Sequence, residues 1–478
     1  MSGSSTTDLQ NHFPVGRYSK SPTFAGSDKG SMSGSSTTDL QNHFPVGRYS
    51  KSPTFTGFGR VRCLQALAQA PCRGLRPPTY KAPPSLPTHS GGMPLRFMDI
   101  FHAIAGVFQT PAITSAAWGF ASSFALCVLL VLTKRWHGAL TMDFTDGIQK
   151  FHTAPTPRVG GIPIVLGLVV AWTQAPANVQ AMLTPFLIAG MPAFVFGVAE
   201  DISNRVGVML RLLATMASGL LAWWLTDYSL HRVDIWGVDW FMQFTLVSVL
   251  FTAFAVSGVT NAINIIDGFN GLASTMSSLA FVGYAMIAWQ VGDATMASVS
   301  LLLAACVWGF FWVNWPFGKL FLGDGGSYFI GFGLAWVAVL LLERNPSVSA
   351  FAALIICVHP VTEVLFSIYR RKVKKANPGQ PDRLHFHSLV KRRYVARWFG
   401  QYRACTQNSI TGVLIGFMTL TAIVLANLIY ASTALSAVVF VGLGLGYVAI
   451  YARMVRHSWC SPLTFLLVKR RPTIDPAL

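Results

Sequence analysis

The chain has 478 residues, of which 52% are hydrophobic and 11% are charged, and its formal net charge is +18. Soluble globular proteins carry about 25% charged residues, so this composition excludes an ordinary soluble domain and indicates a helical membrane protein. Lys and Arg gather in a few short loops between apolar runs, which is typical of a membrane-topology signal and not of a nucleic-acid-binding surface.

The N-terminal segment contains a tandem repeat: residues 1–24 recur without change as residues 32–55, and a proline-rich stretch follows. The copies are rich in Ser, Thr, Pro and Gly and lack apolar periodicity, so they cannot bury a core. We predict that residues 1–95 are a disordered low-complexity segment, or a mis-assigned start upstream of Met93 or Met98. Residues 96–456 would then form a polytopic transmembrane domain, and residues 457–478 a basic cytoplasmic tail.

From Ser115 onward, the apolar runs predict an all-α integral membrane protein, a polytopic bundle of about eleven transmembrane helices. The expected spans are residues 115–133, 159–173, 183–198, 207–225, 241–259, 273–290, 295–315, 326–342, 348–368, 410–430 and 434–452. The loops alternate between a basic set and a set in which Arg232 and Arg344 are the only strong bases. Because cytoplasmic loops carry the excess of Lys and Arg, the N-terminus is expected outside and the C-terminus in the cytoplasm.

Five polar motifs lie in the basic loops or at the helix ends beside them. They are KFHTAPTPRVGG (150–161), AEDISNR (199–205), NAINIIDGFNG (261–271), FLGDGGS (321–327) and RLHFHSL (383–389). Polar groups near a bilayer are costly and usually functional, and five independent motifs rarely fall on one face by chance. We therefore predict a shared site built from loops on the cytoplasmic surface of the membrane.

Four carboxylates lie at the ends of the predicted spans in these motifs: Glu200, Asp201, Asp267 and Asp324. One such acid alone is better explained as a helix cap or as the partner of a loop Arg. Four acids on one face would repel each other unless a cation neutralised them. Oxygen ligands without a nearby cysteine suit Mg²⁺, with Mn²⁺ as the alternative, and Mg²⁺ is usually held by one or two carboxylates together with substrate phosphates.

Basic side chains in the same motifs are candidates to bind phosphate oxygens. They are His152, Arg158, Arg211, Arg383, His385 and His387. For the arginines, the alternative is that they only set the membrane topology. His385 and His387 add little to the positive-inside signal. Glu363 lies inside an expected span, where we expect a hydrogen-bonded supporting role. Clustered carboxylates, a divalent cation and convergent bases are the parts of phosphoryl-transfer chemistry, with a lipid phosphate as the natural acceptor in a membrane.

These motifs resemble those of the polyprenyl-phosphate N-acetylhexosamine-1-phosphate transferases, over about residues 151–403. The resemblance is carried by NAINIIDGFNGLA, FLGDGGSYFIGF, HTAPTPRVGGI and HFHSL. It implies an eleven-helix phosphotransferase of the bacterial cytoplasmic membrane, with its active site facing the cytoplasm. The implied reaction moves an N-acetylated sugar-1-phosphate from a UDP-sugar to undecaprenyl phosphate and releases UMP, with Mg²⁺ as the cofactor.

The resemblance also implies roles for individual residues. Asp324 matches the principal magnesium ligand, and Glu200 and Asp201 match a pair of acids to which metal contact or activation of the lipid phosphate is attributed. The lipid phosphate is expected to be activated near Asp201, with Glu200 or Asp267 as the alternatives. The residues expected to shape the nucleotide site or the donor pyrophosphate site are Asn261, Asn264, His385 and His387.

The chain departs from the family pattern at three positions. Glu200 replaces an Asp, Asn270 stands where many members have a second Asp, and Ser388 interrupts a loop that is often rich in His. The absence of an unbroken three-histidine run favours the branch that initiates O-antigen or other cell-surface polysaccharide synthesis. The expected partners are a UDP-sugar and undecaprenyl phosphate, not nucleic acid, and a homodimer is left open. The alternatives are the phospho-N-acetylmuramoyl-pentapeptide transferase of peptidoglycan synthesis and a secondary transporter, which would show inverted repeats and acids at the membrane midplane.

Overall fold

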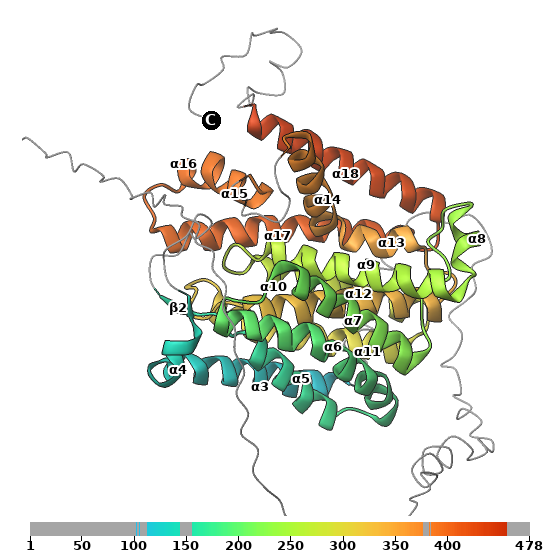
Figure 1. Ribbon diagram of the computed structural model, residues 1–478, viewed down its shortest axis with the longest axis horizontal. Coiled ribbons are helices and arrows are strands. Elements are labelled where there is room, and N and C mark those ends of the chain that lie inside the picture. The colour runs from blue at the N-terminus through green and yellow to red at the C-terminus, as the bar shows by residue number, and fades with distance from the viewer. Residues whose placement is uncertain are drawn as a thin grey trace, which may run out of the picture. The chain divides into compact units, whose positions relative to one another are not determined.

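The computed structural model describes residues 102, 105, 112–143, 155–375, 382 and 384–456. The repeat region within residues 1–95 and the tail from residue 457 onward lie outside the described residues, so both of those expectations remain predictions. The described part of residues 90–478 is almost entirely helical (Figure 1). The predicted all-α membrane architecture is confirmed.

The long helices are α3 (Ile113–Leu132), α6 (Ala177–Ser203), α7 (Val208–Thr226), α9 (Thr245–Ile266), α10 (Leu272–Gln290), α11 (Ala294–Asn314), α12 (Gly323–Arg344), α17 (Ala404–Ile429) and α18 (Thr433–Val455). The shorter helices are α4 (Lys134–Thr141), α5 (Gly161–Thr173), α8 (Val238–Met242), α13 (Ala350–Ile356), α14 (Val358–Val373), α15 (Phe386–Val390), the π-helical turn η1 (Lys391–Val395) and α16 (Ala396–Trp398). Among the described residues, the strands are β1 (Met142–Asp143) and β2 (Thr156–Pro157), which pair antiparallel with Met142 opposite Pro157.

Every expected span corresponds to a helix, but the predicted count of eleven is not confirmed. Within the described ranges, nine helices are long and apolar enough to cross a membrane. The expected span 348–368 is instead a pair, α13 and α14, bent by 84° at Cys357, and together they would make a tenth. The expected span 159–173 is α5, whose 13 residues rise about 20 Å, well short of the hydrocarbon thickness. The expected span was itself short and matches α5, whereas the bend within 348–368 was not predicted.

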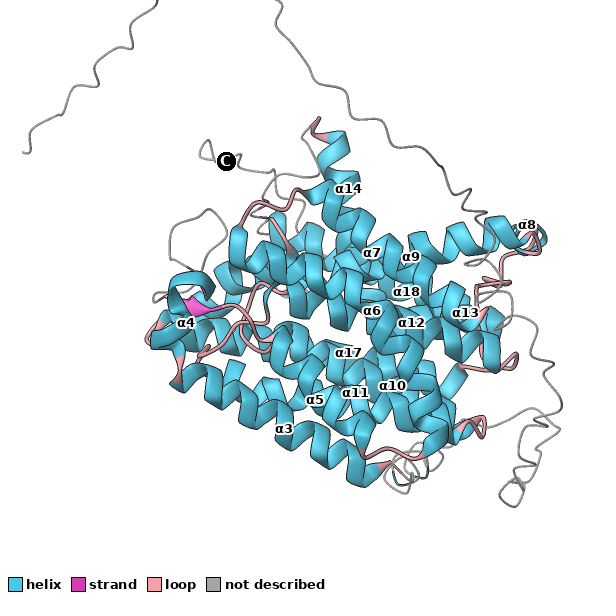
Figure 2. Cartoon of the chain, turned by 60° about the horizontal axis from the view of Figure 1, so that its bottom comes forward, coloured by secondary structure: helices cyan, strands magenta, loops and turns pink. Residues whose placement is uncertain are grey.

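Helix α12 forms the centre of the bundle. Within its apolar 18-residue stretch 94% of the residues are buried, compared with 28% for α3 and 11% for α18. It packs against α6 and α9, and also contacts α5 and α10. Figure 2 shows α3 along one edge of the bundle and α14 projecting from the opposite side. In lipid, every backbone polar group must be satisfied within the protein, which is why continuous helices carry these apolar runs.

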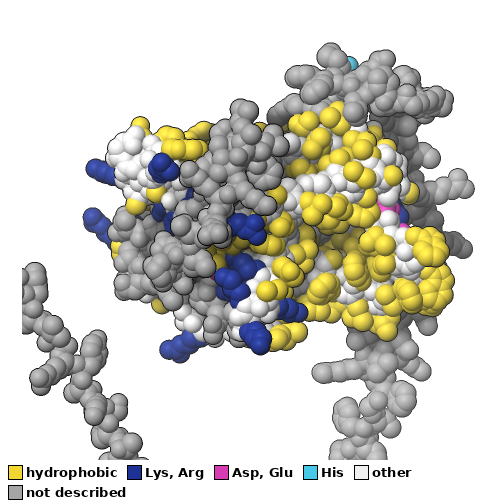
Figure 3. All heavy atoms as spheres, turned by 90° about the horizontal axis from the view of Figure 1, so that it is seen from above, with side chains coloured by type: hydrophobic (Ala, Val, Ile, Leu, Met, Phe, Trp, Pro, Cys, Tyr) yellow, Lys and Arg dark blue, Asp and Glu magenta, His cyan; other side chains and the backbone are white. Residues whose placement is uncertain are grey.

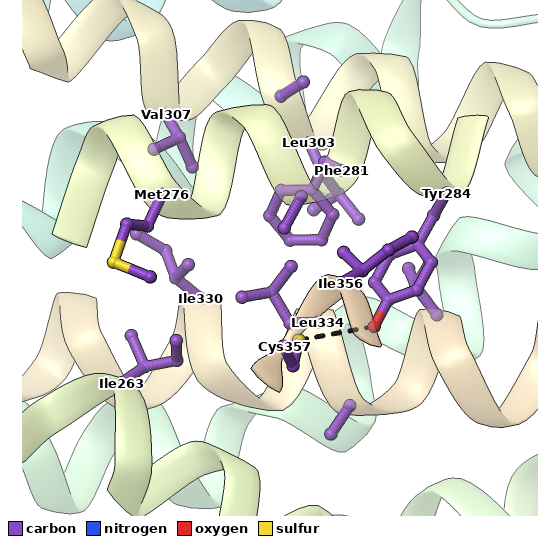
Figure 4. Close-up of a cluster of buried hydrophobic side chains, with 14 of the residues drawn as sticks. Ile263, Met276, Phe281, Tyr284, Leu303, Val307, Ile330, Leu334, Ile356 and Cys357 are labelled. Atoms are coloured by element: carbon purple, nitrogen blue, oxygen red, sulfur yellow. Dashed lines mark hydrogen bonds between the residues drawn. The ribbon is translucent and has the colours of Figure 1, made fainter. Parts of the chain in front are cut away.

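The core at the middle of the bundle brings together side chains from five helices, α9 to α13 (Figure 4). Phe281 of α10 and Leu334 of α12 are both buried there, and Ile356 and Cys357 close the cluster where α13 ends. The hydroxyl of Tyr284 is satisfied by the Ala353 carbonyl at 3.0 Å and by Cys357 Sγ at 3.3 Å. The bend between α13 and α14 is therefore anchored to the core on its α13 side.

Glycines let α5 and α6 approach the start of α12 at backbone distance. A Cβ added to Gly197 of α6 would lie 2.6 Å from the Cα of Gly325, and a Cβ on Gly161 of α5 would collide with Gly326. Small residues at helix contacts allow this close packing in membranes. The first turn of α12, which carries Asp324, is consequently packed tightly between α5 and α6.

We expect Gly197→Ala to destabilise the bundle by about 1–3 kcal/mol, because the added methyl forces α6 and α12 apart. The measurement is thermal unfolding of the detergent-solubilised protein. The matched control is Gly446→Ala in α18, where an added Cβ meets nothing within 4 Å. Equal midpoints for the two variants would contradict the close contact.

The surface separates into an apolar region and a basic end. Figure 3 shows most of the visible Lys and Arg side chains at the left end, which in Figure 1 holds α4, β2, α15 and α16, while hydrophobic side chains cover most of the right half. Large apolar side chains point outward from the long helices, such as Trp224, Phe254 and Val438, which are 66–70% exposed. A lipid environment explains this exposure, and the protein is a multi-pass membrane protein.

Candidate functional site

Four helix ends meet at the basic end of the bundle, around the carboxylate of Asp324. Asp324 is the second residue of α12, and its Oδ1 accepts a hydrogen bond from Asn264 Nδ2 of α9 at 3.0 Å. Its Oδ2 forms an ion pair with the guanidinium of Arg211, which lies in the first turn of α7. Glu200, near the end of α6, is 3.9 Å from the same guanidinium. The sequence motifs at 199–205, 261–271 and 321–327 are thus in direct contact, as predicted.

Asn264 binds two side chains of α12 at once. Besides Asp324, its amide nitrogen donates to Ser327 Oγ at 2.9 Å. One turn earlier in α9, Asn261 donates to the Ser257 carbonyl at 2.8 Å and lies 3.3 Å from Thr215 Oγ1 of α7. Asn264 therefore orients the Asp324 carboxylate, whereas Asn261 ties α9 to α7.

Asp201 has contacts that differ from the predicted metal ligation. Its side chain is 1% exposed, and its two oxygens accept the backbone N–H groups of Asp324 at 2.8 Å and Gly325 at 2.9 Å. Backbone N–H groups at a helix start have no partner within the helix, and a carboxylate there also interacts favourably with the helix dipole. Gly323 makes the approach feasible, because its φ is +76° and an added Cβ would collide with Asp201. These contacts indicate that Asp201 positions Asp324, and its predicted contact with the metal stays a prediction.

We expect Asp201→Asn to lower stability by about 1–3 kcal/mol, because an amide can accept only one of the two backbone N–H groups and leaves the other facing an NH₂ group. Thermal unfolding in detergent measures the loss. Asp227→Asn is the matched control, since Asp227 is exposed and its φ of 58° suits Asn. An Asp201→Asn midpoint equal to that of the control would refute the capping role.

Arg158 and Glu200 also bind backbone at this point. Arg158 donates to the carbonyls of Glu200 at 3.0 Å and Asp201 at 3.1 Å, which are among the last carbonyls of α6. Glu200 Oε2 accepts the N–H of Val206 at 2.8 Å, closing the loop between α6 and α7. Arg158 thus holds the end of α6, and its predicted contact with phosphate stays a prediction.

The segment before α5 lies along the loop before α12. Phe321 donates its N–H to the Pro157 carbonyl at 2.8 Å, and Gly160 donates to the Phe321 carbonyl at 2.9 Å. This pairing brings the PTPR motif beside FLGD, as predicted. Two of the predicted binding residues, His152 and Arg383, lie outside the described residues, so their role stays a prediction.

Asp267 lies directly after the last residue of α9, and its half-buried side chain makes no hydrogen bond with the described residues. Burial and the neighbouring Asp324 carboxylate raise the pKa of Asp267 to about 7. A second charged carboxylate beside Asp324 is thus unfavourable without a cation. Asn270, three residues later, instead bonds Ser409 Oγ at 3.2 Å and faces α17.

The donor set fits a magnesium ion held partly by substrate. Across the residues that the structure describes, no group of three or more His, Cys, Asp or Glu side chains is placed to hold a metal ion. Asp324 and Asp267 together supply carboxylate oxygens, and those of Asp267 have no hydrogen-bond partner among the described residues. Mg²⁺ commonly uses one or two carboxylates, waters and substrate phosphates, so these two residues suffice.

His385 and His387 lie at α15, against the loop that carries Asp267. The His387 ring meets Phe269 edge-on with centroids 5.3 Å apart, and a Cβ on Gly268 would lie 2.9 Å from His387 Nε2. Burial lowers the pKa of His387 to about 3, so its ring is neutral at physiological pH. Its predicted part near the pyrophosphate can therefore be a hydrogen bond and not a positive charge.

Sequence reasoning singled out neither Ser327 nor Tyr447 as part of this region. Ser327 lies three residues after Asp324 inside the recognised motif, so its place in that motif was an available signal. Tyr447 is a lone polar tip in the apolar run of α18, and nothing in the sequence connects it to Glu363, whose carboxylate it binds.

The chain is similar to known proteins over its central helices. The model of the family described as glycosyl transferase family 4 matches residues 183–342, which include Arg211, Asn264 and Asp324. A "Probable undecaprenyl-phosphate N-acetylglucosaminyl 1-phosphate transferase" of Bacillus subtilis is 28% identical over 249 residues, which cover 50% of this chain and 66% of the relative. The match thus spans about two thirds of that relative's length.

Two further relatives are named "Undecaprenyl-phosphate alpha-N-acetylglucosaminyl 1-phosphate transferase". The one from Salmonella typhi is 28% identical over 254 residues, 51% of this chain and 67% of the relative. The one from Thermotoga maritima is 28% identical over 277 residues, 58% of this chain and 80% of the relative.

Proposed function

We propose that this chain, whose residues 183–342 match the model of glycosyl transferase family 4, transfers an N-acetylated sugar-1-phosphate from a UDP-sugar to undecaprenyl phosphate and releases UMP. The observation that carries the proposal is the contact of Asn264 and Arg211 with the Asp324 carboxylate, within the segment that the family model matches. The names of the relatives favour this reaction over peptidoglycan-precursor transfer and over transport.

On the donor side, we propose that Asp324 and Asp267 would hold Mg²⁺ against the pyrophosphate of the UDP-sugar. A bound divalent cation there would neutralise the phosphate oxygens and the charge that develops on the leaving group. Asn264 fixes the Asp324 carboxylate, and Asp201 fixes the turn that carries it. Arg211, which pairs with Asp324 here, is close enough to bind a phosphate oxygen as well, since its guanidinium has five donors.

In the reaction, an oxygen of undecaprenyl phosphate forms a bond to the β-phosphorus of the donor. The bond between that phosphorus and the bridging oxygen breaks, and UMP leaves with the bonding electrons. The lipid phosphate must be deprotonated to attack well, and Asp267 is the acid best placed to accept its proton, because its carboxylate is free of hydrogen bonds to the described residues. Glu200 and Asp201 are less suited, since each binds a backbone N–H.

The site is proposed to face the cytoplasm, where UDP-sugars are made, because it lies at the end of the bundle rich in Lys and Arg (Figure 3). The acceptor reaches this end from within the membrane. The product, undecaprenyl-pyrophosphoryl-sugar, would initiate O-antigen or another cell-surface polysaccharide.

A transfer assay with the purified protein tests the proposal. It uses undecaprenyl phosphate, Mg²⁺ and a panel of radiolabelled UDP-sugars that includes UDP-GlcNAc, UDP-GalNAc and UDP-MurNAc-pentapeptide. We expect labelled lipid and UMP in equal amounts from an N-acetylhexosamine donor, and no product after chelation by EDTA. Transfer from UDP-MurNAc-pentapeptide alone would support the peptidoglycan alternative, and no transfer from any donor would refute the proposal.

A further inference from the structure

A buried carboxylate outside the Asp324 cluster joins three helices. Glu363 of α14 is 1% exposed. Its carboxylate accepts hydrogen bonds from His385 Nδ1 at 2.8 Å, from the N–H of Phe386 at 3.1 Å and from Tyr447 Oη at 2.5 Å. Burying a carboxylate is costly unless its oxygens are hydrogen-bonded, and these three donors meet that need. Glu363 thereby connects α14 to the start of α15 and to α18.

The contact with His385 determines which ring nitrogen carries the proton. A carboxylate only accepts hydrogen bonds, so Nδ1 of His385 donates, and Nε2 is left as an acceptor in the neutral ring. The His385 ring stacks on His387, with centroids 5.4 Å apart and planes 18° apart. His387 in turn lies against Gly268 and Phe269, the two residues after Asp267. A continuous row of contacts therefore runs from Glu363 to the Asp267 loop.

His387 provides independent support for a role near a ligand. Its side chain is buried, yet its Nδ1 has no hydrogen-bond partner among the described residues. Buried polar atoms are nearly always paired, and an exception calls for a binding partner such as a ligand or water. The ring that Glu363 holds in place through His385 is thus the ring with an unused polar atom.

A separate set of contacts holds the backbone just before α15. Arg370 donates to the Leu384 carbonyl at 2.8 Å, and Tyr451 Oη donates to the same carbonyl at 2.9 Å. Neither contact involves the ring of His385 or His387. The effect of Glu363 on the rings can therefore be separated from simple anchoring of the segment.

We propose that Glu363, together with Tyr447, is a positioning residue that fixes the tautomer of His385 and holds the His385–His387 pair against the Asp267 loop. The inference rests on the transfer reaction proposed above and adds to it two residues that act through the histidines. Residues that hydrogen-bond to the groups of a site and orient them typically change activity by about 10–100-fold when they are removed.

The decisive variant is Glu363→Gln, which keeps the volume but presents an NH₂ group to His385 Nδ1 and so reverses the tautomer. We expect kcat to fall by about 10–100-fold, with the donor KM changed by less than about threefold. Tyr447→Phe, which removes one of the three donors, should lose about 3–10-fold. The matched control is Tyr451→Phe, the same change on the same helix, which should stay within about twofold of the unsubstituted protein.

A double variant distinguishes positioning from general destabilisation. If Glu363 acts through His385, Glu363→Gln combined with His385→Ala is no slower than His385→Ala alone. Losses that multiply in the double variant, or full turnover in Glu363→Gln, would overturn the proposal.

Hydrogen–deuterium exchange of residues 384–395 gives a readout that needs no turnover. Glu363→Ala should raise exchange at the Phe386 amide by at least about tenfold, because that N–H loses both carboxylate oxygens as acceptors, whereas Tyr451→Phe should not. Unchanged exchange in Glu363→Ala overturns the proposal whatever the activity. If the unsubstituted protein transfers no sugar phosphate, the proposed function fails, and the exchange data still decide whether Glu363 holds the histidine segment.

Discussion

Asp324→Asn is expected to lower transfer turnover by about a thousandfold while the protein remains folded. The amide can still accept from Asn264, so the local hydrogen bond survives, but the negative charge that would hold Mg²⁺ against the donor is lost. Electrostatic groups aimed at developing charge contribute about 10²–10³-fold each, and loss of a cation ligand adds to this. The measurement is kcat for UDP-sugar transfer in detergent, with the midpoint of thermal unfolding recorded on the same preparation.

The matched control for this variant is Asp239→Asn. Asp239 is also half-buried, accepts the N–H of Val233 at 2.7 Å and lies in the first turn of α8, away from the Asp324 cluster. Its substitution should leave turnover within about twofold, because an amide oxygen can accept the same N–H. An Asp324→Asn protein as active as this control would refute the role of Asp324 as the cation ligand.

Much of the fold was predictable because lipid exposure imposes long apolar runs, and each expected span does contain a helix. His359, Pro360 and Glu363 interrupt the apolar run at 348–368 and signal a break there, but they do not specify a bend of 84° at Cys357. The short span expected at 159–173 corresponds closely to α5 at Gly161–Thr173.

The grouping of the site residues followed from the alternation of basic loops, but their individual contacts did not. Arg158 and Arg211 look alike as loop bases, yet Arg158 binds the carbonyls that end α6 and Arg211 binds Asp324. Similarly, Asp201 and Asp324 are both acids at helix ends. Only the fold shows that Asp201 accepts the backbone N–H groups of Asp324 and Gly325. Spacing along a sequence fixes which end of a helix a residue occupies, not which partner its side chain meets.

Asp267→Asn is expected to lower turnover by about 100-fold or more without loss of stability. The Asp267 side chain makes no hydrogen bond with the described residues, so the amide disturbs no native side-chain hydrogen bond, but it removes one of the two charges proposed to bind the cation. Groups that stabilise developing charge contribute about 10²–10³-fold each in rate, so the loss of this one is expected to cost about a hundredfold. Titration of activity with Mg²⁺ should also show a higher concentration at half-maximal rate.

Asn270→Asp is the informative counterpart, because the family pattern that the sequence resembles has an acid at this position, three residues after Asp267. Asn270 donates to Ser409 Oγ at 3.2 Å and is 7% exposed, so a carboxylate there faces a hydroxyl that already donates to the Pro316 carbonyl. We expect this variant to lose about 1–3 kcal/mol of stability and to gain no activity, either alone or combined with Asp267→Asn. Recovery of turnover in the double variant would show that the two positions share one cation, and that the charge at Asp267 is not specifically required. If turnover is not recovered and Asp267→Asn alone is still folded, the cation is tied to Asp267, the residue directly after α9.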